Sequence, residues 1–451
     1  MEENEQSGSP AKRTSPAPSN DLIFVSIDTQ RADRLGVYGY KHDTTPNLDA
    51  FAEEAVVFED HHAQSSLTLP SHVSILTGLN PPNHGVRNNG KFRLTDRALT
   101  LAEILGDAGY STAAIISAGV LSPIFGLNQG FDFYDGDFSG LDDKTQTDAA
   151  AATRRAVAWL EKRRKDERLF LFVHYYDPHP PFSAPPRFRF DHGYDAEVAF
   201  VDEQIGKLFS YLEKIERFED ALIVVTSDHG ESLGEHAVLG HTIVLYEQTL
   251  HIPLLVRFPG AKHGGERVDR LTRNIDLMPT LLSHLGLRPP ERIDGASLLS
   301  SIGADSSAPE PSSYAETFYA PMVQLHQKSI IDDGWKLISF FTIPPGTAIG
   351  RYIESEEIRS KTLEPVPPPM RPNYVQLIKS IPKARALFDL RSDREERVNL
   401  YFEKPREAKR LERLLDGMRA AVPGERFVPK RNIVEQLRSL GYLQLRSDRR
   451  L

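Results

Sequence analysis

The stretch Leu22-Ile-Phe-Val-Ser-Ile27, followed directly by Asp28-Thr29, decides the fold of this chain. A continuous apolar run of this length is typical of a strand that is buried on both faces of a parallel sheet. Similar runs recur at residues 110–117, 169–174, 221–227 and 252–256. Helical patterns lie between them, at residues 46–55, 99–108, 148–163 and 194–215. Strands that alternate with helices predict an α/β core with a central, mostly parallel sheet and helices on both faces. We expect this core to span residues 21–300.

The regions on either side of the core differ from it in composition and in predicted secondary structure. Residues 1–20 are rich in Ser, Pro and Glu and predict a disordered tether. Such a tether would suit an exported protein whose signal has been removed, but a ragged terminus explains it equally well. Residues 301–451 predict a small α+β subdomain with an antiparallel sheet and terminal helices. Its expected strands are 313–317, 328–331, 335–339 and 386–390, its helices are 404–421 and 432–443, and a proline-rich surface loop covers 344–372.

Composition excludes several classes of protein. The 451 residues include 54 Lys and Arg against 63 Asp and Glu, a net charge of −9, which argues against a nucleic-acid partner. The absence of cysteine excludes disulfides, thiolate metal sites and a Cys nucleophile. Apolar runs are of strand length, so we expect no transmembrane segment.

Metal-ligand residue types follow several of the expected strands. The first strand ends at Asp28, another ends at Asp228-His229, and a third ends in the segment His174–His179. Because parallel strands end at one edge of a sheet, these side chains are expected to meet there. Carboxylates with imidazoles favour zinc or manganese over calcium. Taken alone, Asp28 is better explained as a turn or helix-capping residue, but together with Asp228-His229 it favours a metal site.

The segment Ser65-Ser-Leu-Thr-Leu-Pro-Ser-His-Val-Ser-Ile-Leu-Thr-Gly78 predicts a helix that begins near Pro70 and runs to about Thr77. Thr68 then lies at the N-terminus of the helix. A hydroxyl in this place gains from the helix dipole, which stabilises an alkoxide or a bound phosphate. The alternative is that Thr68 only caps the helix.

The chain resembles the sulfatase family of the alkaline phosphatase superfamily, and the resemblance spans nearly all of the sequence after residue 20. The segment that decides it is Thr68-Leu-Pro-Ser-His72 with Ile75-Leu-Thr-Gly78, which is similar to the family's nucleophile motif. The other matching segments, in order, are Val25–Asp33 with Gly36–Gly39, Tyr176–Phe182, Ser227–His236, Leu245–Leu255, and Leu387–Leu390 with Asn399-Leu400. The resemblance implies an alkaline-phosphatase-like fold.

Departures from the family pattern bear on the chemistry. Sulfatases carry a Cys or Ser nucleophile that is converted to formylglycine, whereas Thr68 cannot be converted in this way. The positions that diverge most are Thr29 for an Asp ligand, His229 for Asn, His72 for Arg and His241 for Lys. A metal set of Asp28, Thr68, Asp228 and His229 resembles that of nucleotide pyrophosphatases and phosphoethanolamine transferases. Asn89, His179 and His241 are spaced like the phosphate-contacting residues of phosphonate monoester hydrolases.

The resemblance therefore implies a metal-dependent hydrolase that acts on phosphodiesters or phosphonate monoesters, or transfers the phosphoryl group, through a Thr68 nucleophile. His72, His179 and His241 are expected to be catalytic and Asn89 to bind the substrate, a small-molecule or a lipid- or glycan-linked ester. The divalent metal is expected to be zinc or manganese, without formylglycine, although His179 and His241 could instead hold a second metal with Asp177. A sulfatase that works without formylglycine and a non-catalytic binding protein on the same scaffold are the two alternatives.

Overall fold

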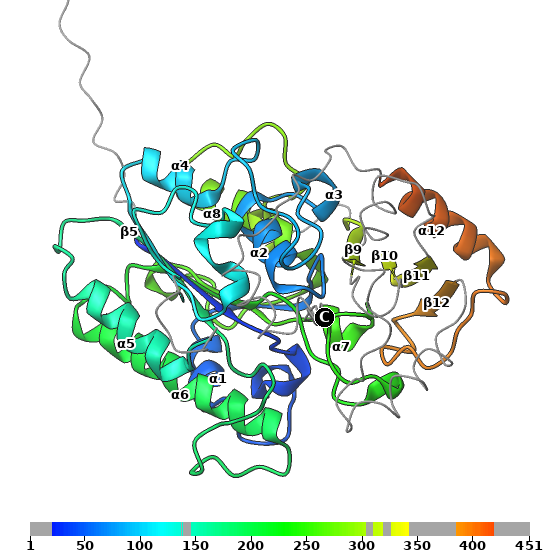
Figure 1. Cartoon of the computed structure of the whole chain (residues 1–451), viewed down its shortest axis with the longest axis horizontal. Coiled ribbons are helices and arrows are strands. Elements are labelled where there is room, and N and C mark those ends of the chain that lie inside the picture. The colour runs from blue at the N-terminus through cyan, green and yellow to red at the C-terminus, as the bar shows by residue number, and fades with distance from the viewer. Residues whose placement is uncertain are drawn as a thin grey trace, which may run out of the picture.

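The computed structural model describes residues 20–136, 138, 146–303, 310–318, 326–341 and 385–418 (Figure 1). The proline-rich stretch 344–372, the helix expected at 432–443 and all of the expected tether except Asn20 lie outside these residues. In the described part of the chain, no helix is both long and apolar enough to cross a membrane.

An eight-stranded sheet forms the centre of the molecule, with strand order β4-β3-β5-β1-β6-β7-β2-β8. The strands are β1 (Leu22–Ile27), β2 (Val56–His62), β3 (Ser111–Ile115), β4 (Phe133–Asp135), β5 (Leu169–Tyr175), β6 (Leu222–Ser227), β7 (Leu254–Arg257) and β8 (Arg267–Arg273). All neighbouring pairs are parallel except the two that involve β7, which runs antiparallel to β6 and β2. The prediction of a central, mostly parallel sheet is confirmed.

Helices cover both faces of this sheet, as Figure 1 shows. One face packs against α2 (Thr68–Thr77), α4 (Leu101–Asp107) and α8 (Leu277–His284), and the other packs against α1 (Pro46–Ala52), α5 (Ala149–Leu160) and α6 (Gly193–Lys214). The strand β1 explains the arrangement: Leu22 and Phe24 belong to the first core, and Ile23, Val25 and Ile27 belong to the second. Side chains of a strand alternate between faces, so an apolar run fills two cores at once.

Short helices connect the larger elements. The α-helical ones are α3 (Pro81–His84) and α7 (Glu247–Leu250). The 3₁₀ turns are η1 (Ala32–Arg34), η2 (Gly36–Tyr38), η3 (Gly119–Leu121), η4 (Pro123–Phe125), η5 (Glu235–Ala237), η6 (Pro259–Ala261), η7 (Asn274–Asp276) and η8 (Leu298–Ser301).

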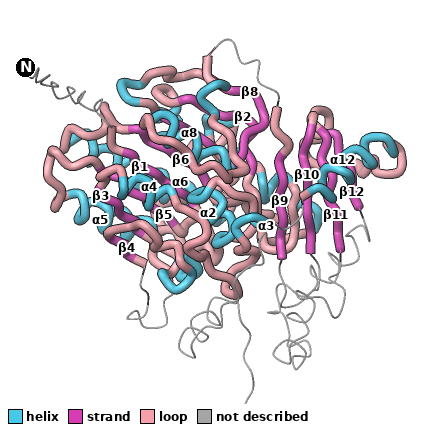
Figure 2. Tube along the Cα trace, turned by 90° about the horizontal axis from the view of Figure 1, so that it is seen from above, coloured by secondary structure: helices cyan, strands magenta, loops and turns pink. Residues whose placement is uncertain are grey.

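A second, antiparallel sheet stands beside the first, as Figure 2 shows. Its order is β12-β11-β10-β9, with bounds β9 (Ser313–Phe318), β10 (His326–Asp332), β11 (Trp335–Phe341) and β12 (Arg385–Asp389). The amphipathic helix α12 (Pro405–Gly417) covers one face through Ala408, Leu411 and Leu415. The other face packs against the segment 238–246, which belongs to the core. The predicted small antiparallel sheet is confirmed.

Buried charges join the two sheets. The backbone of Glu316 on β9 forms an isolated β-bridge with Ser65, and its side chain forms an ion pair with Arg87. Lys336 on β11 is fully buried, and its Nζ lies 2.8 Å from Glu247 of α7 and 2.9 Å from Glu396. Because a buried ammonium is strongly disfavoured without partners, this contact fixes β11 against α7.

Candidate active site

The candidate site begins where two neighbouring strands end. β1 and β6 pair in parallel, and Ile27 stands opposite Ser227. The residues that follow, Asp28 and Asp228, therefore leave the same edge of the sheet side by side. His229 comes next, and all three side chains are almost completely buried.

The three side chains converge like the ligands of a cation. Ligand atoms of Asp28, Asp228 and His229 lie within 4.8 Å of one another. His229 Nδ1 donates to the carbonyl oxygen of Gly230 at 3.0 Å, so Nε2 of the neutral ring carries a lone pair. This Nε2 atom lies 3.3 Å from Asp228 Oδ2 and 3.9 Å from Asp28 Oδ1. Both of these carboxylate oxygens are buried, and neither has a hydrogen-bond partner in the part of the chain that the structure describes. Two unpartnered carboxylate oxygens beside an imidazole lone pair fit a divalent metal.

The electrostatics of the cluster lead to the same interpretation. Burial raises the pKa of Asp28 to about 7. Burial and the nearby charge of Asp28 raise the pKa of Asp228 to about 7. Burial lowers the pKa of His229 to about 4, which keeps its ring neutral. A bound cation would favour the ionised carboxylates and the neutral imidazole, and so would remove the unfavourable charge.

Thr68 lies beside this cluster. It is the first residue of α2, and the N-cap position before it is Leu67, so its hydroxyl is not the helix cap. Thr68 Oγ1 lies 3.3 Å from His229 Nε2, and the residue is fully buried. Ser71, one turn along, donates its hydroxyl to the carbonyl oxygen of Asp228 at 2.6 Å and holds α2 against the end of β6. The hydroxyl of Thr68 thus meets both the positive end of a helix and the candidate ligands.

His72 requires a correction to the expected role. Its Nδ1 donates to the carbonyl oxygen of Thr68 at 2.8 Å, and its Nε2 therefore accepts from the hydroxyl of Ser26 at 2.9 Å. The ring is fully buried. Since both nitrogens are engaged inside the protein, His72 is placed to brace the first turn of α2 against β1 and not to contact a substrate.

Asn89 keeps a donor free beside α2. Its Oδ1 accepts the backbone N–H of Leu69 at 2.9 Å, which lies in the first turn of the helix. Its Nδ2 is buried and has no hydrogen-bond partner among the described residues. An unpartnered buried amide is costly, and an anion bound near Thr68 would satisfy it.

His179 and His241 form a row of imidazoles with His229. The ring centroids of His229 and His241 are 4.5 Å apart, and those of His241 and His179 are 5.1 Å apart. His179 Nδ1 donates to the carbonyl oxygen of Pro180 at 2.7 Å. Burial lowers the pKa of His179 to about 3 and that of His241 to about 4. Each ring therefore offers Nε2 as a proton acceptor.

His174 was expected only as one of the metal-ligand types at the end of a strand, and Glu231 was not expected to have a role. His174 on β5 accepts the N–H of Ser117 through Nδ1 at 3.4 Å, and its Nε2 faces Asp28 Oδ2 at 3.5 Å. Glu231 is buried, and its Oε2 accepts His241 Nδ1 at 2.9 Å. A single polar residue in an otherwise apolar strand was the available signal for His174. For Glu231, the sequence held no signal beyond its nearness to His229.

Other polar residues near the strand ends have structural partners. Asp177 accepts the backbone N–H of Ala149 at 2.6 Å, at the start of α5, and hydrogen-bonds to the Glu197 carboxyl group. It is therefore occupied away from the His179–His241 pair, and the expected option of a second metal held with Asp177 does not fit. His251 bonds to the carbonyl oxygen of Glu59 at 2.8 Å.

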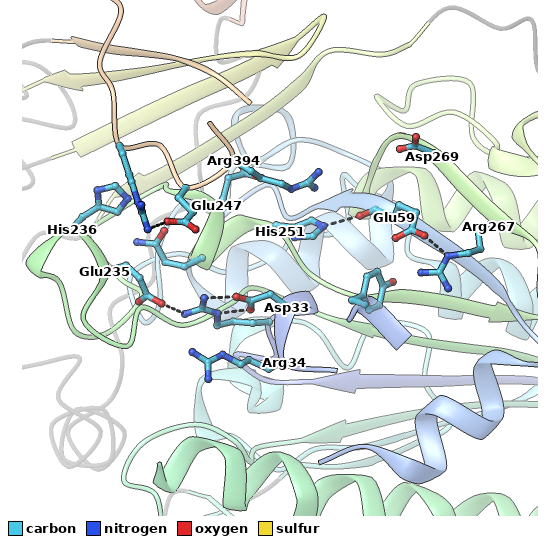
Figure 3. Close-up of a pocket in the computed structure, with 15 residues that line it drawn as sticks. Asp33, Arg34, Glu59, Glu235, His236, Glu247, His251, Arg267, Asp269 and Arg394 are labelled. Carbon is cyan, nitrogen blue, oxygen red and sulfur yellow. Dashed lines mark hydrogen bonds and ion pairs between the residues drawn. The ribbon is translucent and has the colours of Figure 1, made fainter. Parts of the chain in front are cut away.

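A cavity of about 1080 Å³ lies beside the 3₁₀ turn at 235–237 (Figure 3). Its charged side chains pair with one another, including Arg31 with Asp33 and Glu235. None of the three converging ligands lines it. A second group of ligand types, at its border, is Asp60, His62 and Glu247. Because Arg394 and Lys336 already neutralise these carboxylates, this group is a poorer cation site than the first.

Comparisons with known families give two matches. The sulfatase family model matches residues 20–287. The model described as N-sulphoglucosamine sulphohydrolase, C-terminal, matches residues 234–347. The first match contains every residue of the candidate site, from Asp28 to His241.

Known relatives fall into two kinds. N-acetylglucosamine-6-O-sulfatase of Bacteroides thetaiotaomicron is 25% identical, over 64% of this chain and 71% of its own length. The multifunctional alkaline phosphatase superfamily protein PehA of Trinickia caryophylli is 27% identical, over 72% of this chain and 88% of its own length.

Solved structures share the fold. The phosphonate monoester hydrolase of Agrobacterium radiobacter superposes with a TM-score of 0.67 at 21% identity, over 88% of this chain and 95% of its own. A protein solved with its substrate D-glucosamine-2-N,6-O-disulfate superposes with a TM-score of 0.69 at 21% identity, over 88% of this chain and 97% of its own.

Proposed function

Because the chain belongs to the sulfatase family of the alkaline phosphatase superfamily and is an ester hydrolase of that superfamily, we propose that it cleaves phosphodiesters or phosphonate monoesters through Thr68. The observation that carries the proposal is the Thr68 hydroxyl, which lies 3.3 Å from His229 Nε2 at the N-terminus of α2. A threonine can form a phosphoester, but it cannot become formylglycine.

The residues that would hold the metal are Asp28, Asp228, His229 and Thr68 through Oγ1. Two carboxylates, an imidazole and a hydroxyl suit zinc or manganese better than calcium, which prefers a larger cage of oxygens. A divalent ion bound there would lower the pKa of the Thr68 hydroxyl and withdraw charge from the phosphoryl oxygens.

The first step is in-line attack of Thr68 Oγ1 on phosphorus. The Oγ1–P bond forms and the P–O bond to the leaving alcohol breaks. The proton that Thr68 loses passes to the free Nε2 of His179 or His241 and then to the leaving oxygen. The unpartnered Nδ2 of Asn89 donates to a non-bridging oxygen as negative charge builds there.

The second step restores the enzyme. Water attacks phosphorus, the Oγ1–P bond breaks, and Thr68 regains its proton. If an alcohol takes the place of water, the same step transfers the phosphoryl group. The proposed substrates are small-molecule or lipid- or glycan-linked esters, because the residues named here would contact only the tetrahedral group.

A sulfatase that works without formylglycine is the second candidate, favoured by the family match and by relatives named as sulfatases. The chemistry of Thr68 argues against it. A sulfated threonine has no adjacent hydroxyl that could collapse and expel sulfate, so release would need direct attack by water at sulfur.

The experiment that tests the proposal compares matched aryl phosphodiester, phosphonate monoester and sulfate ester substrates, with zinc or manganese supplied. We expect the phosphorus esters to be cleaved faster. Thr68→Ala should abolish turnover, Thr68→Ser should retain part of it, and mass spectrometry of a quenched reaction should find the peptide that contains Thr68 carrying the phosphoryl group with its remaining ester group, or the phosphonyl group when the substrate is a phosphonate. Sulfatase activity without phosphodiesterase activity, or full activity of Thr68→Ala, would overturn the proposal.

A further inference from the structure

Glu231 and His241 meet because the chain between them folds back on itself. Gly240 N donates to the carbonyl oxygen of Ser232 at 3.0 Å, and Leu233 bridges Leu239. These contacts close the segment 232–240 at its base. They bring Glu231 Oε2 to 2.9 Å from His241 Nδ1, with the two side chains 1% and 7% exposed.

In the described part of the chain, no Lys or Arg forms an ion pair with the Glu231 carboxylate. Arg31 approaches Glu231, but its Nη1 binds the backbone carbonyl at 3.0 Å and leaves the carboxylate alone. Oε1 is buried without a hydrogen-bond partner in the described chain. Glu235, in the same closed segment, differs: Arg31 binds its carboxylate at 2.7 Å and the N–H of Leu233 donates to it at 2.8 Å. Among the described side chains, the imidazole of His241 is the hydrogen-bond partner of the Glu231 carboxylate, which also accepts the backbone N–H of Ser232.

This hydrogen bond determines which nitrogen of His241 is available. A carboxylate oxygen accepts, so Nδ1 carries the proton and Nε2 is the nitrogen left for chemistry. The ring also lies at 31° to that of His229 and at 66° to that of His179. A ring flip would break the bond to Glu231 and direct a carbon, not Nε2, to its present position.

We propose that Glu231 is a positioning residue that holds His241 as the Nδ1–H tautomer and keeps Nε2 turned to the substrate. The inference rests on the proposed function, since it assigns Glu231 the task of orienting one of the proposed acid–base residues. A carboxylate behind an imidazole is a common way to fix the orientation and tautomer of the ring.

The kinetic test compares Glu231→Leu with Glu231→Gln, using the zinc-supplied full-length protein and an aryl phosphonate monoester. We expect Glu231→Leu to lower kcat by about 10- to 100-fold with little change in KM. Glu231→Gln should recover most of kcat, because the amide oxygen still accepts the Nδ1–H. Glu235→Gln is the matched control in the same segment, and its kcat should stay near that of the wild type.

A double variant separates positioning from general damage. Once His241 is replaced by Gln, adding Glu231→Leu should lower kcat no further, because Glu231 acts through that ring. If the two losses multiply, or if Glu231→Gln is as impaired as Glu231→Leu, the inference is wrong.

Histidine-selective ¹⁵N NMR gives a readout that needs no turnover. The signal assigned to His241, by its loss in His241→Gln, should show the Nδ1–H tautomer in the wild type and should change to Nε2–H or to exchange in Glu231→Leu. An Nε2–H tautomer in the wild type would overturn the inference even if the esters are cleaved. Inactivity toward every ester would count against the proposed function alone.

Discussion

Replacement of Asp228 by asparagine should stabilise the metal-free protein above neutral pH, although it alters a candidate metal ligand. Asp228 Oδ1 accepts the backbone N–H groups of Thr29 at 3.2 Å and of His229 at 2.8 Å. An asparagine oxygen can accept both. Oδ2 lies 3.3 Å from the lone pair of His229 Nε2, so an amide nitrogen in its place would donate a hydrogen bond to the ring. The substitution exchanges a repulsion for an attraction and changes the volume very little.

The magnitude follows from the pKa of Asp228, which burial, together with the charge of Asp28, raises from 3.8 to about 7. Between these values the folded state keeps a proton that the unfolded state has lost, so stability falls as the pH rises through this window. Above pH 7 the full effect is about 4 kcal/mol at 1.36 kcal/mol for each pH unit. Because Asp28 shares the same burial, we expect a gain of about 2 to 4 kcal/mol for Asp228→Asn at pH 8.

Urea unfolding with a chelator present, at several pH values from 5 to 8, measures the difference. The advantage of Asp228→Asn should grow from pH 5 to about pH 7 and then level off, and added zinc should reverse the order by stabilising the wild type. Asp276→Asn is the control, since that carboxylate is as deeply buried but is paired with Arg273 at 2.7 Å and should lose stability on substitution. A metal-free Asp228→Asn protein less stable than the wild type at pH 8 would refute the reasoning.

Three further outcomes are expected. Lys336→Met should lower the free energy of unfolding by about 3 to 5 kcal/mol, because it removes the ammonium group that two buried carboxylates share and leaves Glu396 without its cation, while Glu247 keeps His62; a smaller loss in urea unfolding would contradict the contact with Glu247. Thr29→Val should raise metal-free stability by about 1 kcal/mol, since the buried Thr29 hydroxyl has no partner; thermal unfolding that is unchanged or lower would refute this. His174→Gln should weaken zinc binding by about 10-fold, because Nε2 no longer faces Asp28; competition with a chromophoric chelator measures the change, and equal affinities would contradict it.

The sequence predicted those parts of the site that depend on strand ends. The apolar runs gave β1 and β6, and parallel pairing alone placed Asp28 beside Asp228 and His229. The strands β2 and β8 were not predicted, because Val56–His62 ends in paired histidines and Arg267–Arg273 is charged and forms an edge. β2 joins the rest of the sheet through β7, and β8 joins it through β2. No local pattern in the sequence reveals that β7 runs antiparallel to its neighbours.

The roles of individual side chains were harder to predict than the strand ends, because these roles depend on tertiary hydrogen bonds. His72 was expected to face the substrate, but Ser26 on β1 and the Thr68 carbonyl occupy both of its nitrogens. The pairing of Glu231 with His241 requires closure of the segment 232–240, which no helical or strand period encodes. Thr68 could be placed at the start of α2 from Pro70, yet its approach to His229 follows from the Ser71 contact with Asp228.

The buried ion pairs between the C-terminal sheet and the core limit which chimeras of this protein and its relatives can fold. The contacts of Glu316 with Arg87, and of Lys336 with Glu247 and Glu396, tie β9 and β11 to loops that also carry Asn89 and the α7 segment. A chimera that takes residues 301–451 from a relative without these partners inherits unmatched buried charges on both sides of the junction. Grafts that move Arg87 and Glu247 together with the C-terminal sheet should therefore express as folded protein far more often than grafts cut at residue 300.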